Sequence, residues 1–126
     1  MQNEDNEITV DPKLVEAFHL MFDCYPEAAQ LTHKSKKIVA LNPACEAFGR
    51  QVGMICIKHG SPESHKGCLA NKAIKEQIYK RNLHLAEIPA KREYSVFWLP
   101  VPGHPDFYIH FSAGHPSYYP DAVPVD

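Results

Sequence analysis

The sequence has no long apolar run and no strong excess of charge of either sign. Its 126 residues carry 13 Lys and Arg against 15 Asp and Glu, a net charge of −2 with histidine neutral. That balance gives no general electrostatic footprint for nucleic acid or for a membrane surface. No apolar stretch approaches the roughly 20 residues that a membrane-spanning helix needs. The acidic, polar residues 1–11 exclude a Sec-type signal peptide, so we expect a cytoplasmic chain.

The sequence also lacks the short motifs that mark common catalytic sites. It contains no G-x-S-x-G turn, no glycine-rich phosphate loop and no H-E-x-x-H helix. A cysteine beside a histidine could act as a nucleophile, but nothing supplies an orienting third group or an evident oxyanion hole. We therefore expect that this protein is not an enzyme.

The residues that are present fit one globular domain, with 44% hydrophobic and 22% charged residues. Residues 1–11 form a polar lead, and residues 114–126 an irregular, proline-rich tail. The domain proper is expected at residues 12–113. It should open with a cap helix at residues 12–22, because apolar side chains recur there at helical spacing. Its buried face should contain Leu14, Phe18, Met21 and Phe22.

The most informative stretch follows this helix. Residues 28–33 alternate apolar and polar side chains, the period of a half-buried strand. A polar turn of hairpin length leads to a second apolar strand at residues 37–42. Asn42 can then cap a short helix, and Pro43 suits its first position because the missing N–H would be unpaired there anyway.

This order of pieces resembles the opening of PAS sensory domains, where a strand, a polar turn, an I-x-x-x-N segment and a short helix ending in glycine follow one another. The matching residues are Pro26, Glu27, Ile38, Asn42, Phe48 and Gly49. The resemblance extends to Ser112. It implies an α+β fold, a five-stranded antiparallel sheet of order 2-1-5-4-3 with helices on one face and an N-terminal cap helix. It also implies sensing and protein interaction in signal transduction, read by an output partner or fused domain.

The second half of the chain supplies the remaining elements. Apolar spacing predicts a long helix over about residues 64–79, and the prolines of residues 100–105 predict a loop. Three strands are expected at residues 83–89, 94–99 and 107–112. The strand at 94–99, Y-S-V-F-W-L, is apolar on both faces, so both faces of the sheet must be covered. The cap helix or a second subunit would cover the outer face, and we expect a homodimer through that helix.

A small-ligand site is expected between the sheet and the long helix, since an apolar cleft with a few polar groups is the usual form of such sites. Its apolar lining would be Leu41, Phe48, Leu69, Ile74, Phe97 and Phe111, and its polar groups Tyr94, Trp98 and His110. A filled core without a ligand is the alternative, because aromatic residues at strand spacing usually belong to the core.

The sharpest local cluster is Cys56, His59, His65 and Cys68, two sulfurs and two imidazoles within 13 residues. Zinc accepts this ligand set, although the inner gap is shorter than in a zinc finger. A redox-active thiol pair or inert thiols with exposed histidines fit the same residues. A small metal- or thiol-dependent protein is therefore the alternative function.

Two further cofactors are disfavoured. Flavin-binding photosensors of the PAS family carry N-C-R-F-L-Q where this sequence has M-I-C-I-K-H at residues 54–59, so Asn, Arg and Gln are missing. Haem-binding PAS domains use a histidine on the long helix. His65 is the one histidine of the predicted helix, and it lies at the very N-terminal end.

Overall fold

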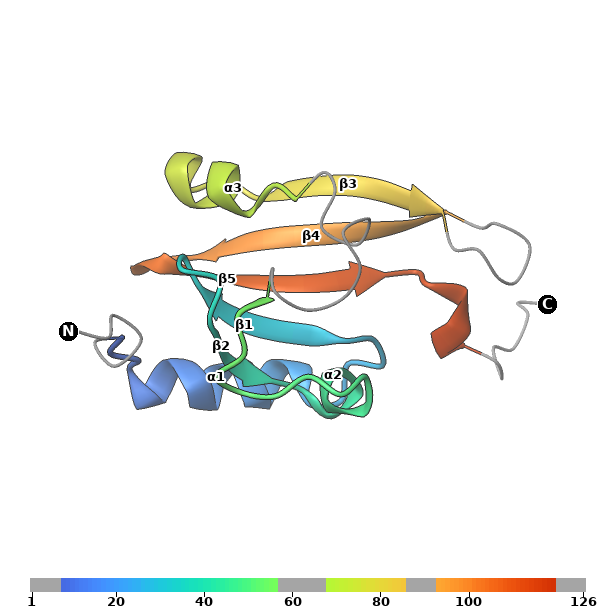
Figure 1. Cartoon of the computed structure of the whole chain (residues 1–126), viewed down its shortest axis with the longest axis horizontal. Helices are drawn as coiled ribbons and strands as arrows, with labels where there is room; N and C mark the ends of the chain where they lie inside the picture. Colours follow the sequence, from blue (N-terminus) through green and yellow to red (C-terminus); the bar gives the residue numbers. More distant parts are fainter. Residues whose placement is uncertain (1–7, 57–67, 86–92, 120–126) are drawn as a thin grey trace.

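The computed structural model describes residues 8–56, 68–85 and 93–119, and its centre is one five-stranded sheet (Figure 1). The strands are β1 (Ala29–His33), β2 (Ile38–Leu41), β3 (Lys80–Leu85), β4 (Glu93–Val101) and β5 (His104–Ala113). They lie in the order β2-β1-β5-β4-β3, and every neighbouring pair is antiparallel. The predicted fold class and strand order are confirmed.

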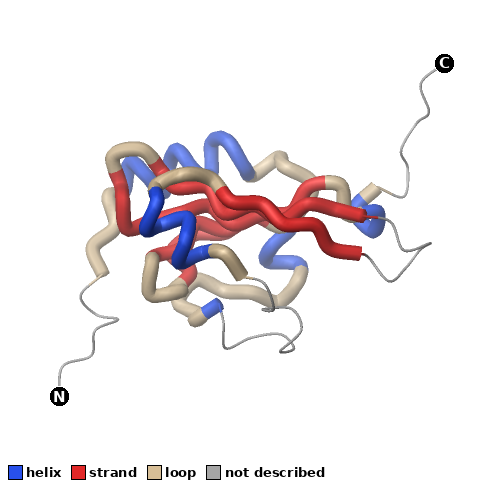
Figure 2. The backbone as a smooth tube through the Cα atoms, turned by 90° about the horizontal axis from the view of Figure 1, so that it is seen from above, coloured by secondary structure: helices blue, strands red, loops and turns tan. Residues whose placement is uncertain are grey.

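Helices lie on both sides of the sheet (Figure 2). They are α1 (Pro12–Phe22), α2 (Pro43–Ala47) and α3 (Ala70–Glu76), followed after β5 by the 3-10 turn η4 (Pro116–Tyr118). We call the side that α1 covers the outer face, and the side of α2 and α3 the inner face. No helix in the described part of the chain is long and apolar enough to cross a membrane.

Helix α1 forms where the sequence predicts it. The Asp11 carboxylate accepts a hydrogen bond from the Lys13 amide at 2.9 Å, which satisfies one of the helix's unpaired N–H groups. Leu14 and Phe18 are 9% and 1% exposed against the outer face. Burial of each contributes about 1.5–3 kcal/mol. Met21 is 65% exposed, contrary to expectation. Because a helical turn has 3.6 residues, the row Leu14, Phe18 and Phe22 winds around the helix, and Met21 lies at the edge of the buried face.

The register of β1 and β5 sorts side chains onto the two faces. Leu31 pairs with Ile109 and Ala29 with Phe111 on the outer face, whereas Thr32 pairs with Tyr108 on the inner face. Leu31, Thr32 and Tyr108 are all buried. Both faces of β1 and β5 are therefore covered. In β4, whose doubly apolar pattern led to the prediction of two covered faces, Trp98 is buried on the inner face but Leu99 is 36% exposed on the outer face.

The long helix is shorter than predicted. Helix α3 ends at Glu76 because Gln77 adopts a left-handed conformation, with φ of 55°, and Ile78 and Tyr79 are exposed. Cys68 and Leu69 precede the helix, and residues 64–67 lie outside the described residues. The third strand is likewise displaced, because β3 already begins at Lys80.

The predicted proline loop at residues 100–105 is wrong. Strand β4 continues to Val101 and β5 begins at His104, so a tight turn joins them. Gly103 has a φ of +80°, which this turn requires and glycine tolerates without strain. Pro100 stays in the strand because the pairing register shifts between Pro100 and Val101, the kind of irregularity that accommodates a proline.

Candidate ligand-binding site

Asn42 fixes the position of α2 against the sheet and is fully buried. Its side-chain oxygen accepts hydrogen bonds from the amides of Ala29 and Cys45, both at 3.0 Å. Its side-chain nitrogen donates to three backbone carbonyls, those of Phe22 at 3.0 Å, Tyr25 at 3.3 Å and Glu27 at 3.0 Å. The predicted cap is thus confirmed, and one side chain joins the end of α1, the start of β1 and the start of α2.

Glu27 fastens the segment after β5 to the same region, although it is 0% exposed. Its carboxylate accepts hydrogen bonds from the Ser112 hydroxyl at 2.7 Å and from the amides of Gly114 at 2.6 Å and His115 at 3.3 Å. The Tyr119 hydroxyl also donates to it. A buried carboxylate needs such donors because burial removes its water. Residues 114–119, predicted as part of an irregular tail, are therefore held on the domain.

Tyr25 reinforces this attachment. Its hydroxyl donates to the Ser112 carbonyl at 2.5 Å. Burial, with a smaller contribution from the Glu27 carboxylate, raises the pKa of Tyr25 to about 12. The hydroxyl therefore keeps its proton, and its role as a donor, throughout the physiological pH range.

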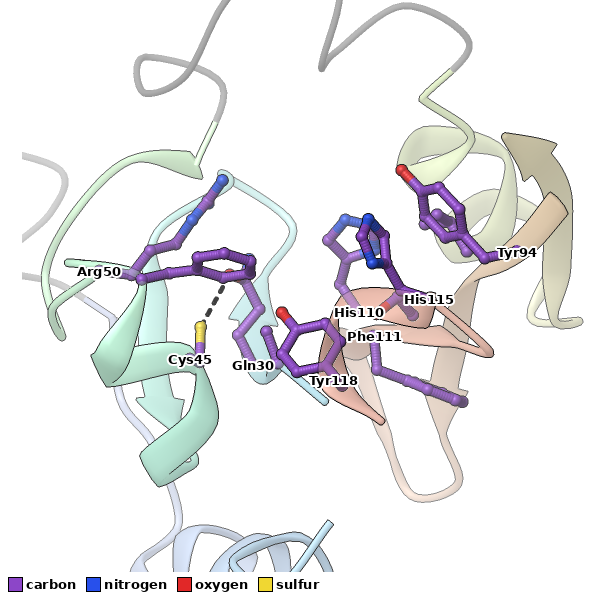
Figure 3. A pocket seen from close by; sticks show the side chains of 12 residues that line it. Gln30, Cys45, Arg50, Tyr94, His110, Phe111, His115 and Tyr118 are labelled. Atoms are coloured by element: carbon purple, nitrogen blue, oxygen red, sulfur yellow. Dashed lines mark hydrogen bonds between the residues drawn. The ribbon is translucent and has the colours of Figure 1, made fainter. Parts of the chain in front are cut away.

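A cavity of about 270 Å³ opens between the inner face, α2 and residues 114–119. In Figure 3, Arg50 lies on one side of it, and Tyr94, His110 and His115 lie on the other. The lining residues are Ala28, Gln30, Cys45, Phe48, Arg50, Tyr94, Val96, His110, Phe111, Ser112, His115 and Tyr118.

Four of the nine predicted ligand-binding residues lie at this cavity, namely Phe48, Tyr94, His110 and Phe111. His110 is held by its Nδ1, 3.0 Å from the Phe97 carbonyl, and by a stacked contact with Trp98. Phe111 borders the cavity, but its ring packs against Phe22, Tyr25 and Phe97 on the outer face.

The other five lie elsewhere. Leu41 packs with Ile38, Cys45 and Cys56 beside α2, and Phe97 is on the outer face. The remaining three, Leu69, Ile74 and Trp98, pack with Ala70, Ala73 and Tyr108 beneath α3. Because Ala70 and Ala73 are small and fully buried, α3 sits directly on the sheet and fills the space where the sequence placed the ligand.

Sequence reasoning found Tyr94 and His110 but missed Arg50, His115 and Tyr118 in the cavity lining. Arg50 follows the glycine that ends α2, whereas His115 and Tyr118 belong to the supposed tail. The His115 ring lies 4.5 Å from the Tyr94 ring and 5.7 Å from the Tyr118 ring, centroid to centroid. In the sequence, the cluster of aromatic side chains after Gly114 was the one feature that could have indicated that this segment packs on the domain.

The thiols at this end of the domain are buried. Burial raises the pKa of Cys45 to about 11, although Arg50 nearby opposes the shift, and its Sγ lies 3.9 Å from the Gln30 side-chain oxygen. Cys45 is therefore protonated at neutral pH. Arg50 Nη1 lies 3.3 Å from the Sγ of Cys56.

The predicted zinc ligands are only partly visible. Cys56 is buried and Cys68 is exposed, while His59 and His65 fall outside the described residues. No group of three metal-ligating side chains occurs within residues 8–56, 68–85 and 93–119. The zinc site therefore stays a prediction.

Comparisons with known proteins support the fold by shape. No family model and no curated protein sequence matches the chain. Among solved structures, the photoactive yellow protein domain of the sensor histidine kinase Ppr from Rhodospirillum centenum is 16% identical, with a TM-score of 0.57 over 81% of this chain and 98% of that one. A PAS domain from Colwellia psychrerythraea is 14% identical, with a TM-score of 0.54 over 81% and 97%.

A sensory box sensor histidine kinase from Vibrio cholerae is similar at 12% identity, with a TM-score of 0.56 over 79% of this chain and 87% of that one. Sequence identities this low show similarity of fold and nothing more. Together with the strand order β2-β1-β5-β4-β3, they show that the chain is a PAS-like domain by structure.

Proposed function

We propose that this chain is a sensory domain of a cytoplasmic signal-transduction protein, and that it binds a small ligand in the inner cavity without catalysing a reaction. The observation that carries the proposal is the make-up of the cavity wall. One side comes from α2 and the sheet, and the other includes His115 and Tyr118 from the segment after β5. A ligand there touches residues that follow the last strand, β5.

The hydrogen bonds of Glu27 connect a ligand in the cavity with the position of the segment after β5. They hold Ser112 and His115, which line the cavity, and Gly114 and Tyr119, which adjoin lining residues. A ligand that displaces His115 or Tyr118 therefore also acts on these bonds. It shifts the balance between two positions of the segment, which an output partner or fused domain reads.

The cavity supports binding rather than chemistry. Its thiol, Cys45, has a pKa raised to about 11 and faces the Gln30 amide oxygen, which accepts a hydrogen bond but does not remove a proton at neutral pH. An activated cysteine needs a lowered pKa or an adjacent base. The Cys45 environment acts in the opposite direction.

A homodimer through α1 is part of the proposal, in a modified form. Leu14 and Phe18 of the predicted apolar stripe are buried on the chain's own sheet, so they are not available to a partner. Leu20 and Met21 remain 87% and 65% exposed on the same helix. If they form the dimer contact, Leu20→Glu with Met21→Glu should convert the dimer to a monomer in light scattering without lowering the melting temperature. A monomeric wild-type chain would contradict the dimer.

Native mass spectrometry of gently purified protein tests the ligand itself. We expect a small molecule that is released unchanged on denaturation. Val96→Phe adds a ring inside the cavity and should abolish its binding, whereas Leu83→Phe adds the same ring on β3, where Leu83 is exposed, and should not. Equal retention of the ligand by both variants would refute the cavity as its site.

A further inference from the structure

The chemistry of the cavity points to a ligand class, and this inference rests on the function proposed above. We infer that the cavity binds a small, single-ring aromatic carboxylate. Its carboxylate group pairs with Arg50, and its ring lies among Phe48, His115 and Tyr118.

The charge balance of the wall selects an anion. Among the lining residues that the structure describes, Arg50 is the single one with a full charge at neutral pH, and none is aspartate or glutamate. Ion pairs in the described residues involve His19, Lys34 and Lys80, and none involves Arg50. The described partner of its guanidinium is the Cys56 sulfur, 3.3 Å from Nη1. A planar guanidinium with donors to spare matches a carboxylate in a two-point contact, whereas a cationic ligand would meet a like charge.

The aromatic wall selects a flat ring. The Phe48 and Tyr118 rings meet edge to face at 5.8 Å between centroids, and His115 meets Tyr118 in the same manner at 5.7 Å. Aromatic rings prefer such neighbours at about 4.5–7 Å. A cavity of about 150 Å³ holds one benzene ring in other proteins. The 270 Å³ here therefore admits one ring with a short polar arm.

The Tyr118 hydroxyl independently indicates a missing partner. It is buried and makes no hydrogen bond of normal geometry among the described residues, although the Ala28 backbone lies close enough to affect its pKa. Figure 3 shows it turned toward the side of the cavity where Gln30 lies. A buried hydroxyl without a partner is unfavourable, and a polar group of a ligand would satisfy it.

Isothermal titration of the whole chain with three probes of equal size tests the inference. These are benzoate as the anion, benzamide as its neutral isostere and benzylamine as the cation. We expect benzoate to bind at least about 10-fold more tightly than benzamide, because hydrogen bonds to a charged group are the stronger kind, and benzylamine to bind most weakly.

Two substitutions separate charge from shape. Arg50→Gln should weaken benzoate binding about 10-fold or more and leave benzamide unchanged. Arg81→Gln removes the same charge from an exposed position on β3 and should change neither. Tyr118→Phe should weaken benzoate binding while the melting temperature is retained or raised, because the phenyl ring stays and the unpaired hydroxyl is gone.

Several outcomes would overturn the inference. Equal affinity for benzamide and benzoate, an unchanged benzoate affinity in Arg50→Gln, or no binding of any probe each refute the carboxylate. In each of these three cases, a ligand that co-purifies with the wild-type chain but not with Val96→Phe would still support the proposed sensory function. Retention of that ligand by Val96→Phe would instead refute the cavity as a sensor site.

Discussion

Replacement of Asn42 should destabilise the domain more than any exposed polar substitution. Asn42→Ala removes a helix cap, which costs about 0.5–2 kcal/mol. It also leaves the Ala29 amide and the carbonyls of Tyr25 and Glu27 without their partner, whereas the Phe22 carbonyl keeps its bond from the Tyr25 amide. Each unsatisfied buried group costs about 1–3 kcal/mol. Because water enters part of the vacated space, we expect a total loss of about 3–5 kcal/mol, out of the roughly 5–15 kcal/mol that stabilises a typical domain.

Asn42→Asp is the sharper test because it preserves size and shape. The aspartate keeps an oxygen for the amides of Ala29 and Cys45, but it places a second oxygen where the donating nitrogen lay. That oxygen faces the three carbonyls of Phe22, Tyr25 and Glu27. Repulsion is then added to the loss of the donors, so at neutral pH this variant should be no more stable than Asn42→Ala.

Urea and thermal unfolding, followed by circular dichroism, measure the effect. A loss of 3–5 kcal/mol should lower the melting temperature by roughly 10–20 °C for a domain of this size. Asn71→Asp is the matched control, because Asn71 is exposed on α3 and its side chain bonds only Lys36 among the contacts described. That change should stay within about 0.5 kcal/mol. Wild-type stability of Asn42→Asp would refute the argument that the amide donors hold α1, β1 and α2 together.

Three further predictions concern the core and the cysteines. Leu14→Asp with Phe18→Asp buries two charges beneath α1 and should cause unfolding or aggregation; an unchanged melting temperature would show that the helix covers nothing. Burial raises the pKa of Cys45 to about 11, so its reactive thiolate forms only as the pH approaches that value. Iodoacetamide at pH 7.5 should therefore label the exposed Cys24 and Cys68 first. Early labelling of Cys45, detected by mass spectrometry, would contradict its burial. We expect no stoichiometric zinc in purified protein; one zinc per chain, with a melting temperature that falls on chelation, would instead establish the site at Cys56, His59, His65 and Cys68.

The fold was predictable because its signals are local. Alternation in β1, the polar turn and the Asn42-Pro43 helix start each follow from a few adjacent residues. Their order resembles that of PAS domains, and this resemblance implies the strand arrangement. The two boundary errors also have local causes. Gln77 ends α3 through a left-handed conformation that non-glycine residues seldom adopt, and Pro100 remains in a strand because the register shifts beside it.

The cavity was less predictable because its position depends on what fills the rest of the inner face. Periodicity assigns Val96, Trp98 and His110 to one side of the sheet, but it does not say which of them a helix covers. Ala70 and Ala73 decide this, since two small residues let α3 pack on Trp98 and Tyr108. The open space is thereby left at the other end, beneath α2, where Val96 and His110 line it.

Glu27 shows why the tail could not be assigned from pattern alone. A glutamate is normally expected at the surface, and this one is buried because donors from residues 85 to 92 positions later in the chain surround its carboxylate. Neither end of that interaction has a periodic signal, since one is a single acid and the other a run of turn-forming residues. Yet the cavity has its second wall because the segment is fastened there. The bonds of Glu27 therefore hold in place the residues that form this wall, and the shape of the cavity depends on them.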